Sequence, residues 1–183
     1  MAKYISILRG INVGGNRKIL MADLKNMFEK LGFGNVQTYI QSGNVILDYE
    51  KVVSGAELER LIQQAISENF KFDVPVIVRT AAEIEESIAG NPFWKEKDAD
   101  IERLHLTFLK KWPVAERLEK LIGLEFLPDR FQIIGKDTFI FCSTGYSDSK
   151  LTNQFFESRL GTLATTRNWK TVIKLHEMIT SND

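Results

Sequence analysis

Apolar residues recur along the first part of the chain with two different spacings, which predict strands and helices in alternation. Residues 3–9 alternate between two faces, with Ile5 and Ile7 on one of them, as in a strand. Apolar residues then recur at helical spacing, and two runs of strand-forming residues follow around a Ser42-Gly43 turn. The predicted elements are strands at 3–9, 36–41 and 44–49 and a helix at 21–31.

Two capping boxes mark the next helix starts. Ser54 stands three residues before Glu57, ahead of a clear apolar stripe that predicts a second helix. Thr80 and Glu83 repeat the pattern before a short helix that ends near residue 90. The strand between these helices, 74–79, contains Pro75, which cannot donate to a ladder and therefore favours the edge of a sheet.

The second part of the chain repeats the same order of elements. A turn signal at Asn91-Pro92 and a charged run to Asp100 form the one break in composition. Beyond it Pro113 fits the first turn of a helix, Gly161 can end another, and Asn168 can cap the last one. The predicted elements are strands at 103–109, 131–134, 138–142 and 162–167 and helices at 113–122, 149–160 and from 169 onward.

Both parts therefore have the order β-α-β-β-α-β-α, which predicts a duplicated α+β fold. Each copy is a ferredoxin-like βαββαβ unit, with an antiparallel sheet and helices on one face. We assign residues 1–90 to the first unit, 91–100 to a charged linker and 101–183 to the second unit. One strand of the second unit, 138–142, is apolar on both faces, so that both faces need cover.

The loop at residues 8–18 is the strongest candidate for a binding site. Glycines allow its backbone to turn and bring N–H groups to a ligand, and its cations suit an anion. It is not a Walker loop, because Asn16-Arg17 stands where Lys-Ser/Thr is required. The matching loop of the second copy is only residues 110–112, so the first loop resembles an insertion with a function of its own. The candidate ligand-binding residues here are Arg9, Gly10, Asn12, Gly14, Gly15, Arg17 and Lys18.

Two further segments add candidate residues. In a βαββαβ unit the first loop and the β-hairpin emerge at the same end of the sheet, so we expect the glycine loop to meet Gln41, Ser42 and Asn44. These residue types are also typical of turns. Arg167, Asn168 and Trp169 join a cation, a helix cap and a large aromatic at a strand end; a capped helix with a packed Trp is the alternative interpretation.

Composition limits the remaining chemistry. Lys+Arg and Asp+Glu both total 24 in 183 residues, so the chain has no net charge to attract nucleic acid or an anionic membrane. The single cysteine, Cys142, excludes an intrachain disulfide and is expected in the core; His105 and His176 give no metal-ligand spacing. No signal peptide or membrane-spanning run is present, which favours the cytoplasm.

Three segments resemble those of a known family. Residues 8–15, 38–45 and 165–172 are similar to the signature segments of the bacterial domain of unknown function 1697 family. The resemblance implies a cytoplasmic protein of duplicated α/β architecture; it implies no substrate, cofactor or catalytic residue.

The sequence thus supports three functional hypotheses. The first is a small phosphate- or carboxylate-bearing ligand held between the glycine loop and the hairpin. The second is a nucleic-acid-binding module, which the zero net charge and the lack of an RNP pattern disfavour. The third is a scaffold without a ligand. No complete catalytic constellation, metal site or cofactor motif is present, and the residues leave enzymatic activity and oligomeric state open.

Overall fold

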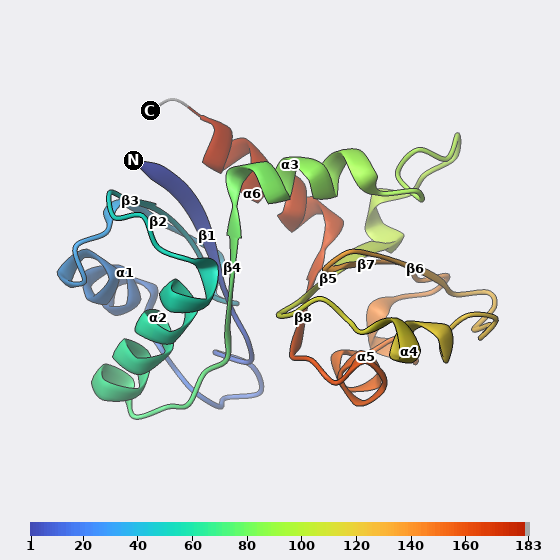
Figure 1. Ribbon diagram of the computed structural model, residues 1–183, viewed down its shortest axis with the longest axis horizontal. Helices are drawn as coiled ribbons and strands as arrows, with labels where there is room; N and C mark the ends of the chain where they lie inside the picture. The colour runs from blue at the N-terminus through green and yellow to red at the C-terminus, as the bar shows by residue number, and fades with distance from the viewer. Residues whose placement is uncertain (182–183) are drawn as a thin grey trace. The chain divides into compact units, whose positions relative to one another are not determined.

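The computed structural model describes residues 1–181, which form two four-stranded antiparallel sheets with helices (Figure 1). The chain divides into two compact units. One contains Met1–Glu85 and the described residues from Leu175 onward; the other is Glu86–Lys174. The duplicated α+β architecture is therefore as predicted.

In the first unit, the sheet has the order β2-β3-β1-β4, with all neighbours antiparallel. Helices α1 and α2 lie on one face of it (Figure 1), where Leu24, Phe28, Leu58 and Ile62 are fully buried. β4 is an edge strand, as Pro75 predicts. The elements are β1 (Ala2–Leu8), α1 (Met21–Lys30), β2 (Gly34–Tyr39), β3 (Asn44–Tyr49), α2 (Gly55–Phe70), β4 (Val76–Thr80) and, running into the second unit, α3 (Ala81–Gly90).

Both capping boxes form. The Glu57 N–H donates to Ser54 Oγ at 3.2 Å, and the Ser54 N–H donates to the Glu57 carboxylate at 2.8 Å. At α3 the Glu83 N–H donates to Thr80 Oγ1 at 3.2 Å, and the Thr80 N–H donates to the Glu83 carboxylate at 2.9 Å. Each pair satisfies two backbone donors that a helix start leaves without partners.

The second unit has the same strand order, β6-β7-β5-β8. Figure 1 shows α4 and α5 together on one face of this sheet, which agrees with their mutual contacts. The elements are η1 (Ile101–Arg103), β5 (Leu104–Leu109), α4 (Ala115–Glu119), β6 (Arg130–Ile134), β7 (Asp137–Phe141), η2 (Tyr146–Asp148), α5 (Asn153–Leu160), β8 (Ala164–Asn168) and α6 (Trp169–Thr180), which ends in the first unit.

The duplication extends to individual hydrogen bonds at the end of the first strand of each unit. The Leu8 N–H donates to the Gly43 carbonyl at 2.8 Å, and the Leu109 N–H donates to the Lys136 carbonyl at the same distance. One residue on, the Arg9 N–H donates to the Pro75 carbonyl and the Lys110 N–H to the Leu163 carbonyl. The two copies therefore match at this point, and the first then continues into the glycine loop.

Side chains on both faces of β7 have packing partners in the second unit. Ile140 and Cys142 belong to the core under α5. On the opposite face Phe139 makes an edge contact with Trp169, with ring centroids 6.3 Å apart. Cys142 is buried as expected, and burial raises the pKa of its thiol to about 11, which leaves it protonated and unreactive at neutral pH.

Two predicted helices of the second unit are shorter than their sequence patterns suggested. The helix expected at 113–122 is only α4, because the N–H groups of Leu121 and Ile122 donate to carbonyls three residues back and close tight turns instead. The helix expected at 149–160 begins at Asn153. Thr152 caps it, whereas the Ser149 hydroxyl accepts from the Leu151 N–H and holds the preceding segment outside the helix.

Candidate functional site

The glycine loop folds into a small hairpin of its own. Val13 and Asn16 form an antiparallel bridge, closed by a 3.0 Å hydrogen bond from the Asn16 N–H to the Val13 carbonyl. Gly14 and Gly15 occupy the turn with φ of 58° and 77°, the two left-handed positions of a type I′ turn. The loop is thus an ordered hairpin, and the turn at its tip requires the two glycines.

The side chain of Asn12 connects the glycine loop to the neighbouring backbone. Its Nδ2 donates to the carbonyls of Ile19 and Gln41, both at 2.9 Å, and its Oδ1 accepts from the Ile19 N–H at 2.9 Å. Both amide hydrogens are therefore used within the protein, so Asn12 positions the loop. Its backbone is left-handed, with φ of 55°, a conformation that Asn tolerates better than most residues.

The predicted meeting of loop and hairpin occurs at Gly43. A Cβ on Gly43 would lie 2.7 Å from Ile11 Cδ1 and 2.8 Å from Leu8 Cβ, and its φ is 84°. Only glycine permits this close approach. Beside it, buried Asn44 donates from Nδ2 to the Tyr39 carbonyl at 3.0 Å and to Ser42 Oγ at 3.1 Å, which stabilises the hairpin turn.

A cavity of about 290 Å³ lies between the glycine loop and the hairpin. Lys18 supplies the one charged side chain of its lining, and Ile19 and Leu20 supply apolar surface. Arg17 is exposed near Gly10, and within residues 1–181 neither Arg17 nor Lys18 forms an ion pair. The lining residues are Asn12, Gly15, Lys18, Ile19, Leu20 and Gln41.

Arg167, Asn168 and Trp169 belong to the second unit and have structural partners there. Arg167 is buried and donates from Nη1 to the Thr166 carbonyl at 2.9 Å; burial lowers its pKa to about 10. Asn168 Oδ1 accepts from the Thr171 N–H at 2.8 Å and so caps α6. Trp169 is fully buried. Each of the three residues therefore has a structural role. That they also contact a ligand stays a prediction.

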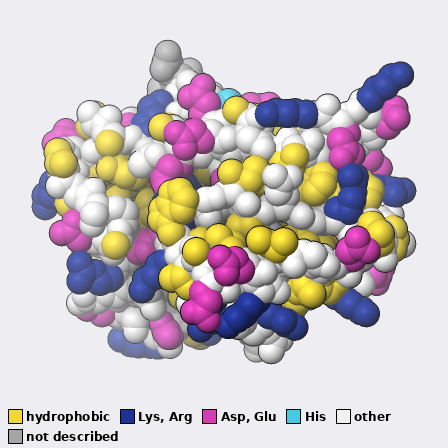
Figure 2. All heavy atoms as spheres, turned by 45° about the vertical axis from the view of Figure 1, so that its right-hand side comes forward, with side chains coloured by type: hydrophobic (Ala, Val, Ile, Leu, Met, Phe, Trp, Pro, Cys, Tyr) yellow, Lys and Arg dark blue, Asp and Glu magenta, His cyan; other side chains and the backbone are white. Residues whose placement is uncertain are grey.

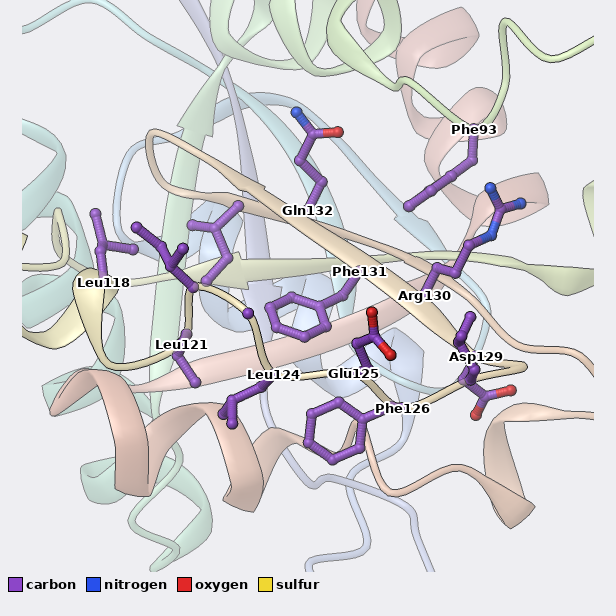
Figure 3. Close-up of a pocket in the computed structure, with 14 residues that line it drawn as sticks. Phe93, Leu118, Leu121, Leu124, Glu125, Phe126, Asp129, Arg130, Phe131 and Gln132 are labelled. Atoms are coloured by element: carbon purple, nitrogen blue, oxygen red, sulfur yellow. The ribbon is translucent and has the colours of Figure 1, made fainter.

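Sequence reasoning missed a larger cavity in the second unit. It measures about 580 Å³ and lies between β6 and the segment that follows α4 (Figure 3). Its signal in the sequence is the apolar run at residues 121–127, where Ile122, Leu124 and Leu127 remain exposed. Such side chains beside a helix of five residues indicate a poorly covered sheet face.

The described residues contain no group of three or more His, Cys, Asp or Glu side chains placed to hold a metal ion. Across residues 1–181, no helix combines the length and apolar character that crossing a membrane requires.

The fold and its matching loops define a class of duplicated ferredoxin-like α+β proteins. The chain belongs to the family described as "Protein of unknown function (DUF1697)", whose model matches residues 1–139. This match contains the glycine loop and the first hairpin, whereas segment 165–172 lies beyond it.

A solved structure has the same fold along almost the entire chain. The conserved bacterial protein SP0830 from Streptococcus pneumoniae superimposes with a TM-score of 0.77 at 24% sequence identity. The alignment covers 98% of this chain and 99% of that one. No curated protein matches the sequence.

Proposed function

We propose that the first unit binds a small molecule bearing a phosphate or carboxylate group, at the cavity between the glycine loop and the hairpin. The observation that carries this proposal is the charge of the cavity: Lys18 is its one ionisable lining residue, and it has no acidic partner among the described residues. An anion entering there gains a cation without displacing an existing ion pair.

The order of the loop supports the same function. The Gly14-Gly15 turn and the Asn12 hydrogen bonds fix the backbone before any ligand arrives. A preformed site loses less conformational entropy on binding than a flexible loop does. Ile19 and Leu20 give the cavity an apolar wall, so the ligand we expect combines an anionic group with an apolar part.

A thermal-shift screen of inorganic phosphate, nucleotides and small carboxylates tests the proposal. A ligand that binds only the folded state stabilises it by about 2.7 kcal/mol at a hundred times its dissociation constant, which gives a clear rise in Tm. The double variant Arg17→Gln with Lys18→Gln should lose the shift. The control Lys95→Gln with Lys97→Gln removes the same charge from an exposed segment of the second unit and should keep the shift. The proposal fails if no anion raises the Tm of the wild type. It also fails if both double variants show the same rise in Tm as the wild type.

Salt dependence separates this function from nucleic-acid binding. A compact site that neutralises one ligand group responds modestly to salt, whereas a strand held through several phosphates is released steeply as salt rises. Fluorescence polarisation with a mixed-sequence single strand should show no binding, even at low salt. Tight, steeply salt-dependent binding that needs Arg17 and Lys18 would instead establish the nucleic-acid hypothesis.

A further inference from the structure

The two units share one topology, but α4 of the second unit is shorter than α1, the corresponding helix of the first unit. In the first unit α1 has ten residues and buries Leu24, Met27 and Phe28 against its sheet. In the second unit α4 has five residues and buries none. In the second unit Leu121 reaches the core and Leu118 packs against it, and a cavity of about 580 Å³ lies beside these two side chains.

The walls of this cavity are apolar. Figure 3 shows the rings of Phe126 and Phe131 and the side chains of Leu121 and Leu124 around a common space. Leu118 and Ile133 are also part of the apolar lining, and the volume is within the range of sites that enclose a small organic molecule. Hydrophobic side chains also reach the molecular surface on the face that Figure 2 presents.

The charged side chains of the lining decide which molecule fits. Arg130 is already neutralised, because its guanidinium donates to both oxygens of Glu96 at 2.8 and 2.9 Å. It also lies over the rings of Phe93 and Phe141, 4.9 and 4.7 Å from their centroids. Arg130 is therefore held by existing partners and does not offer a free cation to a ligand.

The acidic lining residues differ from each other. Asp129 accepts hydrogen bonds from Ser143 and Ser149 and is occupied. Glu125 is exposed and has no hydrogen-bond or ion-pair partner among residues 1–181. The charge left available at the cavity is consequently negative, opposite in sign to that of the glycine-loop cavity.

We propose that this cavity is a second binding site, for a small apolar molecule whose polar end is cationic, with Glu125 as the partner of that end. The apolar part of the molecule contacts the leucine and phenylalanine side chains of the lining. An anionic amphiphile of the same length is disfavoured because Glu125 and Asp129 repel its head group.

The neutral fluorescent dye Nile red provides the first test. The full chain should bind it saturably, with one dye per chain. Leu124→Trp places an indole in the cavity and should weaken dye binding by at least about tenfold, because the larger side chain takes up space that the dye needs. Leu163→Trp enlarges a similarly exposed leucine of the same unit outside the cavity and should keep wild-type binding. Thermal melts of both variants confirm that they fold.

Competition identifies the head group. Decyltrimethylammonium should displace the dye at a roughly fivefold lower concentration than decanoate, both below their micelle concentrations, which corresponds to the modest energy of an exposed ion pair. Glu125→Gln should bring the two within about twofold. The proposal is overturned if dye binding does not saturate, if both Trp variants bind alike, or if decanoate competes as well as the cation. The proposal is also overturned if the chain loses dye binding as it self-associates, because the cavity is then filled by a second copy of the chain.

Discussion

The Asn12 side-chain amide donates to the Gln41 carbonyl oxygen across 2.9 Å and thereby joins the glycine loop to the hairpin 29 residues later. Because the same side chain also bonds both backbone groups of Ile19, it spans the whole base of the loop. The order of the candidate anion site therefore depends on a residue whose own polar atoms are already engaged.

Two substitutions of Asn12 should separate the contribution of its hydrogen bonds to stability from that of its left-handed backbone conformation. Asn12→Gly removes the hydrogen bonds but tolerates the left-handed backbone, and we expect a loss of about 1–3 kcal/mol in the free energy of unfolding. Asn12→Ala should lose about 1 kcal/mol more, since Ala disfavours this conformation. Urea denaturation measures both. Wild-type stability in Asn12→Gly would show that the amide does not hold the loop.

Gly43→Ala should be among the most destabilising single-methyl changes in the protein. The added Cβ must overlap Ile11 and Leu8 as well as adopt a positive φ, so we expect a loss of about 3 kcal/mol. Gly32→Ala is the matched control, because Gly32 has a similar φ of 86° and no atom within 4 Å of an added Cβ. It should cost only about 1 kcal/mol. Equal urea midpoints for the two variants would contradict the steric argument.

His105 should make the protein less stable as the solution becomes mildly acidic. Burial lowers its pKa, a hydrogen bond with the backbone of Arg103 opposes this in part, and the ring stacks on Tyr146 at 4.9 Å. A lowered pKa means that the unfolded chain binds the proton more readily. The free energy of unfolding therefore falls as pH drops below about 6.5, the ordinary value, and continues to fall until the folded pKa is reached.

Melts between about pH 7 and pH 5 test this dependence, which spans the range where an ordinary histidine titrates. His105→Gln should flatten the profile, whereas His176→Gln leaves His105 in place and should retain its slope. A wild-type slope in His105→Gln would assign the pH dependence to another group.

Asp129 should contribute a second pH dependence in stronger acid. Burial by itself raises the pKa of this carboxyl, but hydrogen bonds from Ser149, at 2.6 Å, and from Ser143 outweigh it and lower the pKa. Its stabilising contribution is fully present above about pH 4 and is lost as pH falls through the folded pKa. Ser149→Ala should reduce the change in Tm between about pH 5 and pH 2. The same acid profile in Ser149→Ala and wild type would exclude this role.

Periodicity and capping were sufficient to predict the duplicated topology. The Ser54 and Thr80 capping boxes are local devices that span three residues, so their chemistry can be seen without tertiary information. The same holds for the Ser42-Gly43 hairpin. Because strand order in a βαββαβ unit follows from topology, the meeting of the glycine loop with Gln41 was predictable as well.

What sequence reasoning missed depends on contacts between distant residues. The apolar spacing at 113–122 suits a helix, but nothing in that segment shows that its turns tighten and leave a cavity beside Phe131. Similarly, Asn12 carries the residue type of a ligand contact, and only the position of the Gln41 carbonyl shows that its amide is occupied.

The discontinuity of the first unit affects the order in which the protein can mature during synthesis. Residues 1–85 of that unit are made before the second unit, but the remainder, from Leu175 onward, is made after it; Lys3 Nζ donates to the Ser181 carbonyl at 2.8 Å across this gap. The second unit is continuous between these pieces. Since chains emerge from the ribosome from the N-terminal end, the second unit can be complete while the first still awaits its final helix turns. Of the two units, the one whose synthesis starts first is thus the one that is completed second.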